Sequence, residues 1–275
     1  LRAAGLLSLL ALGIGFGYGE NILSFAENQT YPGSVVYAKS SPYQRIVLSR
    51  GRDHFRLYLN GNLQFDSRDE YRYHEALVHP GLSAIKNPKN VLVLGGGDGL
   101  AVREILKYPS VKHITLVDLD AEVTALFKSR PELATMNGHA FTNPKVEVIH
   151  ADAFTWLRDC KTKFDFVTVD FPDPVNYSVG KLYSLSIYEE LEKVMGEGAI
   201  AAVQSTSPYV APLSYWCVDR TLREAGFYTV PYHTYVPSFG EWGYILAMHR
   251  PWSIPEKYPD GLRFVDPETV AQMLH

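Results

Sequence analysis

The order of strand-like and helix-like segments after residue 89 is the feature that most limits the fold of this chain. Apolar runs of strand length, such as NVLVL at residues 90–94 and HITLVD at 113–118, alternate with segments of helical period, such as LAVREILKY at 100–108. The alternation continues to YILAMH at residues 244–249. Strands that alternate with helices in this way predict an α/β fold with a mostly parallel sheet and helices on both faces.

The segment before this region has a different pattern. Short alternating runs between Tyr31 and about Phe65, separated by turn residues such as Asn-Gly-Asn, predict a small antiparallel β unit. We therefore expect four parts: a hydrophobic segment and linker at 1–30, a small N-terminal β domain at 31–80, a Rossmann-like domain at 81–250, and a C-terminal tail at 251–275.

A glycine-rich turn follows the first strand of the alternating region. The sequence VLVLGGGDGL places Gly95, Gly96, Gly97 and Gly99 around Asp98. Glycines at this point let the backbone turn tightly and approach a ligand closely. The spacing does not complete G-x-G-x-x-G, so it fits an S-adenosyl nucleoside better than a nicotinamide dinucleotide.

Acids stand at the ends of the following strands. Asp118 comes twenty residues after Asp98, where a carboxylate can accept hydrogen bonds from both ribose hydroxyls. Asp152 in HADAF could accept from an adenine amino group. Although one such acid could be a solvated cap, several together predict a nucleoside pocket at the carboxyl edge of the sheet. Asp98 would face the amino-acid end of the cofactor and repel a carboxylate, which favours a decarboxylated cofactor.

Composition narrows the possible partners. The net charge is −4 and no run of Lys or Arg is present, so we expect no nucleic-acid partner, and a cationic substrate is mildly favoured. Cys160 and Cys217 lack C-x-x-C spacing and are interpreted as buried thiols. His74 and His79 are five residues apart, which is not metal-ligand spacing, so no metal site is expected.

Two further acids, Asp170 and Asp173, lie three residues apart in FVTVDFPDP, where an apolar strand runs into a turn. This motif, together with several others, resembles the sequence pattern of the polyamine aminopropyltransferases, of which spermidine synthase is the type member. The other motifs are SPYQRIVL, LYLNGNLQFDSRDEYRYHEALVHP, the glycine-rich turn, HADAF and the later LYS. The resemblance covers about residues 34–250. It implies transfer of an aminopropyl group from decarboxylated S-adenosylmethionine to a diamine or polyamine, with release of methylthioadenosine and without metal or prosthetic group.

The resemblance also implies roles for individual residues. Contacts to the nucleoside co-substrate are expected from Gln44, Gly95, Gly97, Asp98, Asp118, Asp152 and Ala153. Contacts to the amine are expected from Gln64, Tyr73, His74, Asp98, Asp170 and Asp173. Asp170 matches the proton acceptor, because an ammonium cannot attack carbon until it has lost a proton. Asp173 would hold the amine in line.

The sequence departs from the family pattern at four places. Ala153 stands where glycine is usual, DFPDP replaces a more polar version, VNYSVGK at residues 175–181 replaces a Gly-Pro loop, and Phe239 aligns with a tyrosine that lines the amine site. The hydroxyl lost at Phe239 concerns the choice of amine more than the reaction type. Putrescine, giving spermidine, is the expected acceptor; the residues leave longer diamines, agmatine and spermidine open.

The uncharged run AAGLLSLLALGIGFGYG at residues 3–19 resembles the leading segment of the membrane-attached branch of the family. It is slightly shorter than the roughly 20 residues of a transmembrane helix, and the chain begins at Leu1, so we expect the end of such a helix. A signal-peptide core and a buried helix are alternatives. The expected location is membrane-attached with a cytoplasmic catalytic domain.

Other functions remain as alternatives. An S-adenosylmethionine-dependent methyltransferase would share the fold and the nucleoside acids, although Asp98 argues against it. A non-catalytic membrane-tethered module that binds nucleoside or polyamine would not need both Asp170 and Asp173. The exposed edges of a small β domain make a homodimer a reasonable expectation.

Overall fold

The computed structural model describes residues 2–19, 27–174 and 177–275. The chain divides into two compact units, Leu1–Arg68 and Asp69–His275. Residues 69–80, which the sequence analysis assigns to the β domain, belong to the larger unit. They begin helix α3 (Glu70–Leu82), whose Leu77 and Val78 are part of the core of that unit.

The smaller unit contains a four-stranded antiparallel sheet in the order β1-β2-β3-β4, as predicted. The strands are β1 (Ser34–Ser40), β2 (Arg45–Arg50), β3 (Phe55–Leu59) and β4 (Asn62–Asp66). Apolar side chains of β2, β3 and β4, such as Leu48, Leu57 and Phe65, are buried. The Asp66 carboxylate pairs with Arg56 at 2.7 Å and with Arg68 at 2.8 Å, which ties β3 to the end of β4.

The predicted membrane attachment is wrong. Helix α1 (Arg2–Gly17) has 16 residues, and within residues 2–19, 27–174 and 177–275 no helix is long and apolar enough to cross a membrane. This finding removes the support for three expectations. These are assignment to the membrane-attached branch, the alternative of a membrane-tethered module, and the membrane-attached location. Residues 20–26 of the expected hydrophobic segment and linker lie outside the described residues.

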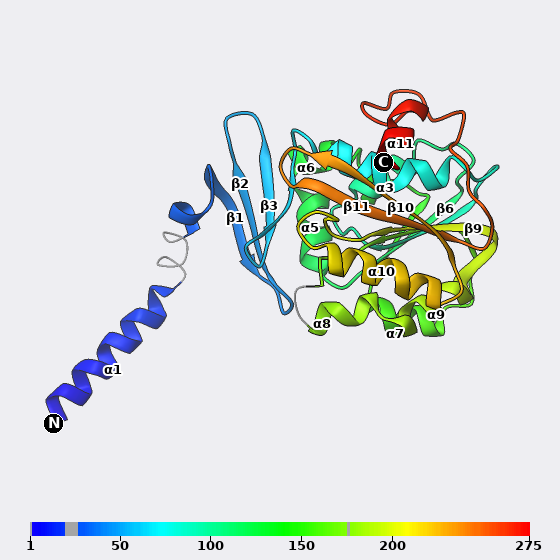
Figure 1. Ribbon diagram of the computed structural model, residues 1–275. Helices are drawn as coiled ribbons and strands as arrows, with labels where there is room; N and C mark the ends of the chain where they lie inside the picture. Colours follow the sequence, from blue (N-terminus) through cyan, green and yellow to red (C-terminus); the bar gives the residue numbers. More distant parts are fainter. Residues whose placement is uncertain (1, 20–26, 175–176) are drawn as a thin grey trace. The chain divides into compact units, whose positions relative to one another are not determined.

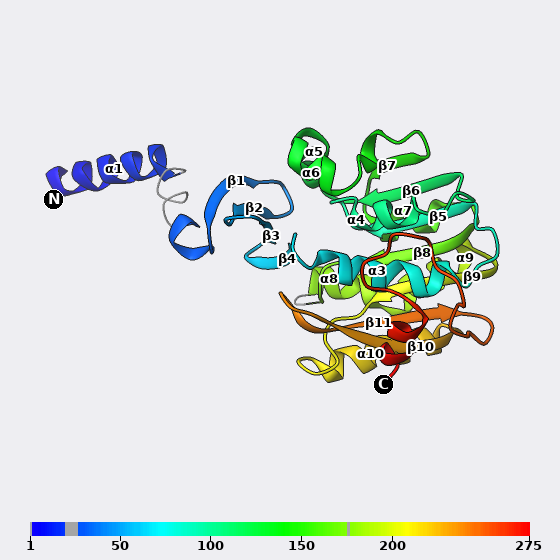
Figure 2. The ribbon, with the colours of Figure 1, turned by 90° about the horizontal axis from the view of Figure 1, so that it is seen from above.

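The larger unit is built on a seven-stranded sheet in the order β10-β11-β9-β8-β5-β6-β7, which Figure 2 shows from above. Strands β5 to β9 are parallel, and β11 and β10 add to one edge in antiparallel fashion. This arrangement confirms the predicted mostly parallel, Rossmann-like sheet. The strands are β5 (Asn90–Gly95), β6 (His113–Asp118), β7 (Val146–His150), β8 (Phe164–Asp170), β9 (Met195–Gln204), β10 (Tyr228–Val236) and β11 (Gly240–Met248).

Helices cover the two faces of this sheet (Figure 1), and an apolar layer lies on each face. Alternate strand residues such as Val91 and Val93 pack with α3, α4 (Leu100–Ile105) and α11 (Pro267–Met273). Their neighbours Leu92 and Leu94 pack with α7 (Ala153–Asp159), α9 (Leu185–Val194) and α10 (Pro212–Glu224). Both faces of β5 are therefore buried, as expected for a central parallel strand. The remaining helices are α5 (Ala121–Ser129), α6 (Pro131–Met136), η1 (Ala140–Thr142), α8 (Tyr177–Gly180) and η2 (Lys181–Tyr183).

The C-terminal residues 251–275 pack onto the larger unit. Val270 and Met273 of α11 belong to the same apolar layer as α3. The buried Glu75 carboxylate accepts backbone N–H bonds from Arg263, Phe264 and Val265 at 2.8–3.2 Å. The interpretation of both cysteines as buried thiols is wrong, because Cys217 lies on the exposed side of α10 and Cys160 is partly exposed.

Candidate active site

The glycine-rich turn lies between two acids of neighbouring strands. A β-carbon on Gly97 would lie 2.8 Å from the Asp118 carboxyl carbon, and one on Gly95 would lie 2.3 Å from the Asp170 carbonyl oxygen. Gly95 has a φ of +78°, a conformation that favours glycine. The turn therefore requires glycine because it runs against the ends of β6 and β8 at the same edge of the sheet.

Asp118 at the end of β6 is held by backbone donors. Its Oδ2 accepts from the Gly97 N–H at 3.0 Å and its Oδ1 accepts from the Asp120 N–H at 2.8 Å. Burial raises the pKa of Asp118 to about 6. A carboxylate fixed beside the turn in this way can accept hydrogen bonds from a diol, which is what the ribose prediction requires.

Asp170 at the end of β8 accepts a hydrogen bond from the Tyr73 hydroxyl at 2.5 Å. Burial raises the pKa of Asp170 to about 6, with His74 opposing the increase and Asp98 adding to it. Asp170, His74 and Asp98 come from β8, α3 and the glycine-rich turn, and the charges of His74 and Asp98 both act on the pKa of Asp170. A partly buried carboxyl with a pKa near neutrality is a suitable proton acceptor.

His74 is the cation among these groups. Burial alone would lower the pKa of His74, but the Glu70 carboxylate, which accepts from Nδ1 at 2.9 Å, raises it to about 9. The Glu70 carboxylate itself accepts hydrogen bonds from both terminal nitrogens of Arg103, at 2.8 and 2.9 Å. His74 is 2% exposed, so at neutral pH it is a buried imidazolium held in one orientation.

Asp98 belongs to the same electrostatic group. Burial raises the pKa of Asp98, while the charge of His74 acts in the opposite direction. Its Oδ1 accepts from the Leu100 N–H at 2.9 Å, at the start of α4. The Asn137 side chain donates to the Asp98 carbonyl at 2.9 Å and fixes the turn from outside the sheet.

Asp173, three residues beyond Asp170, is oriented by the end of β9. Gln204 Nε2 donates to Asp173 Oδ1 and Thr206 Oγ1 donates to Asp173 Oδ2, each at 3.2 Å. Gln204 Nε2 also lies 2.6 Å from the Phe171 carbonyl oxygen, to which Tyr183 donates at 3.0 Å. Burial raises the pKa of Asp173. The turn that carries both acids is therefore fixed by side chains from two other elements.

Asp152 lies at the start of α7, two residues beyond His150, which pairs with Asp118 in the sheet. Its Oδ1 caps the helix by accepting from the Thr155 N–H at 3.0 Å. Its Oδ2 pairs with Lys181 of η2 at 2.9 Å. Burial acts to raise the pKa of Asp152, but Lys181 and the cap lower it, so this acid is ionised at neutral pH. The neighbouring Ala153 is buried.

Aromatic side chains surround the Asp170 end of the site. The ring of Tyr73 lies 5.5 Å from Tyr244 and 6.3 Å from both Phe239 and Trp242, between centroids. Phe239 is thus next to the predicted amine residues, on the turn between β10 and β11. That turn is pinned to α3, because Ser238 donates its N–H and its hydroxyl to Asp69 at 2.7 and 2.8 Å.

The sequence-predicted residues fall into two sets. In the larger unit, one interacting group consists of Tyr73, His74, Asp98 and Asp170. Gly97, which precedes Asp98 in the turn, links this group to Asp118 through its backbone N–H. Gln44 precedes β2, and Gln64 on β4 donates to the Asn62 carbonyl at 3.2 Å; both belong to the smaller unit, so their part in the site stays a prediction. Val175 and Asn176 of the altered loop lie outside the described residues.

Several residues that shape the site were missed. The spacing of Glu70 four residues before His74 on a helix is a signal that could have found that pair. Arg103, Gln204, Thr206 and Lys181 gave no local signal, because each reaches its partner only through the fold.

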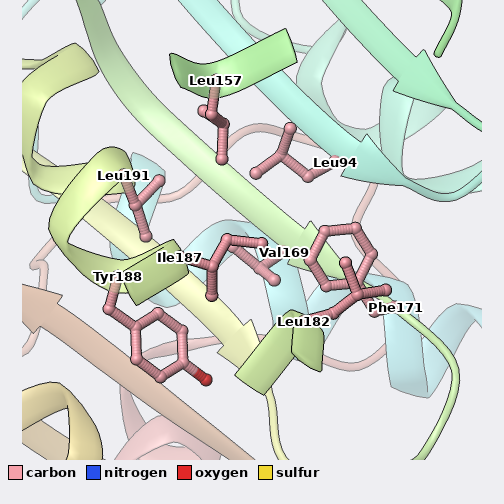
Figure 3. A pocket seen from close by; sticks show the side chains of 8 residues that line it. All are labelled: Leu94, Leu157, Val169, Phe171, Leu182, Ile187, Tyr188 and Leu191. Atoms are coloured by element: carbon pink, nitrogen blue, oxygen red, sulfur yellow. The ribbon is translucent and has the colours of Figure 1, made fainter. Parts of the chain in front are cut away.

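An apolar pocket supports the acid turn from the α9 side of the sheet (Figure 3). It contains no carboxylate or cation, so it offers no chemistry of its own. It is lined by Leu94, Leu157, Val169, Phe171, Leu182, Ile187, Tyr188 and Leu191. Elsewhere in the described part of the chain, no group of three or more His, Cys, Asp or Glu side chains is arranged to hold a metal ion.

Comparison with known proteins identifies the family. Residues 70–256 match the family model for the spermine/spermidine synthase domain. The chain belongs to this family. It is 52% identical over 265 residues to polyamine aminopropyltransferase 2 of Ralstonia nicotianae, a match that covers 96% of this chain and 52% of that protein. It is 50% identical over 266 residues to the polyamine aminopropyltransferase of Leptospira interrogans, covering 97% and 53% of the two chains.

The chain therefore spans about half the length of the curated relatives it matches. Among solved structures, it is similar to a spermidine synthase in complex with the transition-state analogue AdoDATO, with a TM-score of 0.81, 25% identity and coverage of 87% of this chain and 84% of that one. The spermidine synthase of Thermotoga maritima has a TM-score of 0.78 at 24% identity, with coverage of 88% and 84%, and shares the fold.

Proposed function

We propose that this chain is the catalytic region of a polyamine aminopropyltransferase. It would transfer the aminopropyl group of decarboxylated S-adenosylmethionine to a diamine or polyamine, with putrescine as the favoured acceptor, and release methylthioadenosine. Family membership and the names of the relatives support this reaction class. The partly buried acid pair Asp170 and Asp173 is the observation that carries the proposal.

The proposed chemical step is a single displacement. The amine nitrogen attacks the aminopropyl carbon bonded to sulfur, so that a C–N bond forms while the C–S bond breaks. The electron pair of the C–S bond moves to the sulfonium, which leaves as the neutral thioether of methylthioadenosine. The proton of the attacking ammonium goes to Asp170, whose pKa of about 6 makes it a better acceptor than an ordinary aspartate.

Tyr73 and His74 would prepare Asp170 for this step. The Tyr73 hydroxyl fixes the Asp170 carboxyl through Oδ1 and leaves Oδ2 for the amine. The imidazolium of His74 keeps enough positive charge nearby for Asp170 and Asp98 to ionise when an amine arrives. Asp98 would then hold the aminopropyl ammonium, and Asp173 the distal ammonium of the acceptor.

The nucleoside would lie along the edge of the sheet beside the glycine-rich turn. We assign the ribose hydroxyls to Asp118, which accepts two backbone bonds from the described residues and has further lone pairs. We assign the adenine to Asp152 and Ala153, with Gly95 and Gly97 providing the close backbone approach. The aromatic rings around Tyr73 would pack against the methylene chain of the amine.

Product analysis tests the reaction class directly. The protein is incubated with decarboxylated S-adenosylmethionine or S-adenosylmethionine and a panel of putrescine, cadaverine, agmatine and spermidine. We expect methylthioadenosine and an aminopropylated amine in equal amounts, and only from the decarboxylated co-substrate. Formation of S-adenosylhomocysteine instead would identify a methyltransferase, and the absence of both products would refute transfer.

The proposed homodimer rests on the smaller unit. Its sheet has two edge strands, β1 and β4, and an open edge can pair with a second copy. Sedimentation equilibrium at micromolar concentration should give twice the mass of one chain; a single-chain mass at all concentrations would refute the dimer.

A further inference from the structure

Thr206, two residues beyond the end of β9, has an unusual backbone conformation. Its φ is +58°, in the left-handed region, which is rare for a β-branched residue and unfavourable by its sterics. The surrounding structure holds this conformation. The Thr206 N–H donates to Gln204 Oε1 at 2.9 Å, and the Gly243 N–H of β11 donates to the Thr206 carbonyl at 2.7 Å.

The strained conformation points the hydroxyl at an acid of the site. Thr206 Oγ1 donates to Asp173 Oδ2, and Gln204 Nε2 donates to Asp173 Oδ1, so the two residues hold both oxygens of one carboxylate. Both side chains are nearly inaccessible to solvent. Each carboxylate oxygen has a second lone pair, so Asp173 can still accept from an ammonium. Strained residues that persist because their surroundings fix them are found preferentially at functional sites.

We propose that Thr206 is a positioning residue that sets the affinity for the amine by fixing Asp173, at the expense of fold stability. The inference rests on the proposed function, since Asp173 is there assigned to the distal ammonium. A glycine or an asparagine would relieve the backbone, so sterics alone do not explain a threonine at this position. The hydroxyl accounts for it, because it donates to Asp173 Oδ2 from this backbone conformation. A carboxylate that is already oriented loses less conformational entropy when it binds an amine.

The test compares Thr206→Ser, Thr206→Ala and Thr206→Gly, with Thr229→Ala as the control. Thr229 is a buried threonine of β10 whose hydroxyl has no hydrogen-bond partner among the described residues. We expect Ala and Gly to raise the KM for putrescine about tenfold, as for the loss of one hydrogen bond to a charged group, while kcat changes less than about threefold. Ser should restore the KM, and Thr229→Ala should leave it unchanged.

Thermal unfolding of the same variants tests the strain. Thr206→Gly and Thr206→Ala both lack the hydroxyl and differ only by a β-carbon at positive φ. We expect the Gly variant to unfold about 2–4 °C above the Ala variant, which reverses the usual order of these residues. An Ala variant that is the more stable, or one that keeps the KM of the unaltered protein, would overturn the proposal.

Binding measurements separate this inference from the proposed function. If the unaltered protein transfers nothing to any amine, the proposed reaction fails, and putrescine binding is then measured by calorimetry with methylthioadenosine present. A tenfold weaker binding in Thr206→Ala than in Thr206→Ser supports the positioning role. Equal binding in the two variants overturns it.

Discussion

Replacing Asp170 with Asn removes the proposed proton acceptor while preserving its shape. The Asn carbonyl can still accept from the Tyr73 hydroxyl, which lies 2.5 Å from Asp170 Oδ1, so the contact to α3 is retained. What is lost is a group that can take the proton of the attacking ammonium. General-base assistance is typically worth about 10²–10⁴-fold, or about 3–5 kcal/mol of activation free energy. We expect kcat to fall by that factor, with methylthioadenosine affinity nearly unchanged.

The pH dependence gives an independent measure of the same role. Asp170 must be ionised to accept a proton, and its pKa of about 6 means that kcat/KM of the unaltered enzyme should rise with pH up to about 6 and then flatten with respect to this group. The variant lacks that titration. Its activity should instead recover steeply at high pH, where more of the amine is already neutral.

The assay is chromatographic measurement of methylthioadenosine at saturating substrates, together with calorimetry of methylthioadenosine binding. Asp165→Asn is the matched control. Asp165 lies on the same strand β8, but its carboxylate accepts from the Lys89 and Asn90 N–H groups at 2.6 and 2.9 Å, at the other end of the strand. It should keep the kcat of the unaltered enzyme. Full turnover of Asp170→Asn at neutral pH would refute the assignment of the base.

Three further changes test other parts of the site. Asp98→Asn should reduce the preference for decarboxylated S-adenosylmethionine over S-adenosylmethionine, because a neutral side chain no longer repels a carboxylate; calorimetry with both ligands measures it, and an undiminished preference would contradict the assignment. Asp118→Ala should weaken methylthioadenosine binding by about 1–3 kcal/mol, and unchanged affinity would exclude Asp118 from the ribose site. The pKa of His74 is about 9 when folded against 6.5 for a free histidine, so its stabilisation of about 3 kcal/mol is complete below pH 6.5 and is lost as pH rises through 9. Urea unfolding across this range should show the loss, and His74→Gln should not; a loss of equal size in both proteins would assign it to another group.

The sequence predicts most of what the backbone topology determines. Asp118 and Asp170 could be placed at one edge because the carboxyl ends of parallel strands meet there, and the glycine-rich turn could be placed between them. The prediction of a membrane helix rested on hydropathy alone, which does not distinguish a short apolar helix from part of a membrane span. In the described part of the chain, no helix is long and apolar enough to cross a membrane.

The contacts that orient the acids could not be predicted from the sequence, because they join residues that are far apart along the chain. Arg103 reaches Glu70 from 33 residues away, and Gln204 and Thr206 reach Asp173 from 31 and 33 residues away. Such pairs depend on how α3 meets α4 and how β9 ends beside β8. No period or turn motif encodes those distances, whereas the pair of Glu70 and His74 lies within one helix and could be read from spacing.

The charges of the site are unbalanced in the protein without substrate. Burial raises the pKa of Asp98, Asp118, Asp170 and Asp173. The positive charge of His74 opposes the increase at Asp98 and Asp170, and that of Arg103 opposes it at Asp98, but both pKa values stay raised. A group whose pKa is raised by burial destabilises the fold wherever it must ionise. A ligand with a sulfonium and an ammonium, followed by an amine with two or more ammonium groups, would bring the missing positive charge and lower these pKa values. The acids that weaken the free fold would therefore favour a polycation over a neutral or anionic ligand of the same shape, and Asp170 would be driven toward its ionised, proton-accepting form when that polycation binds.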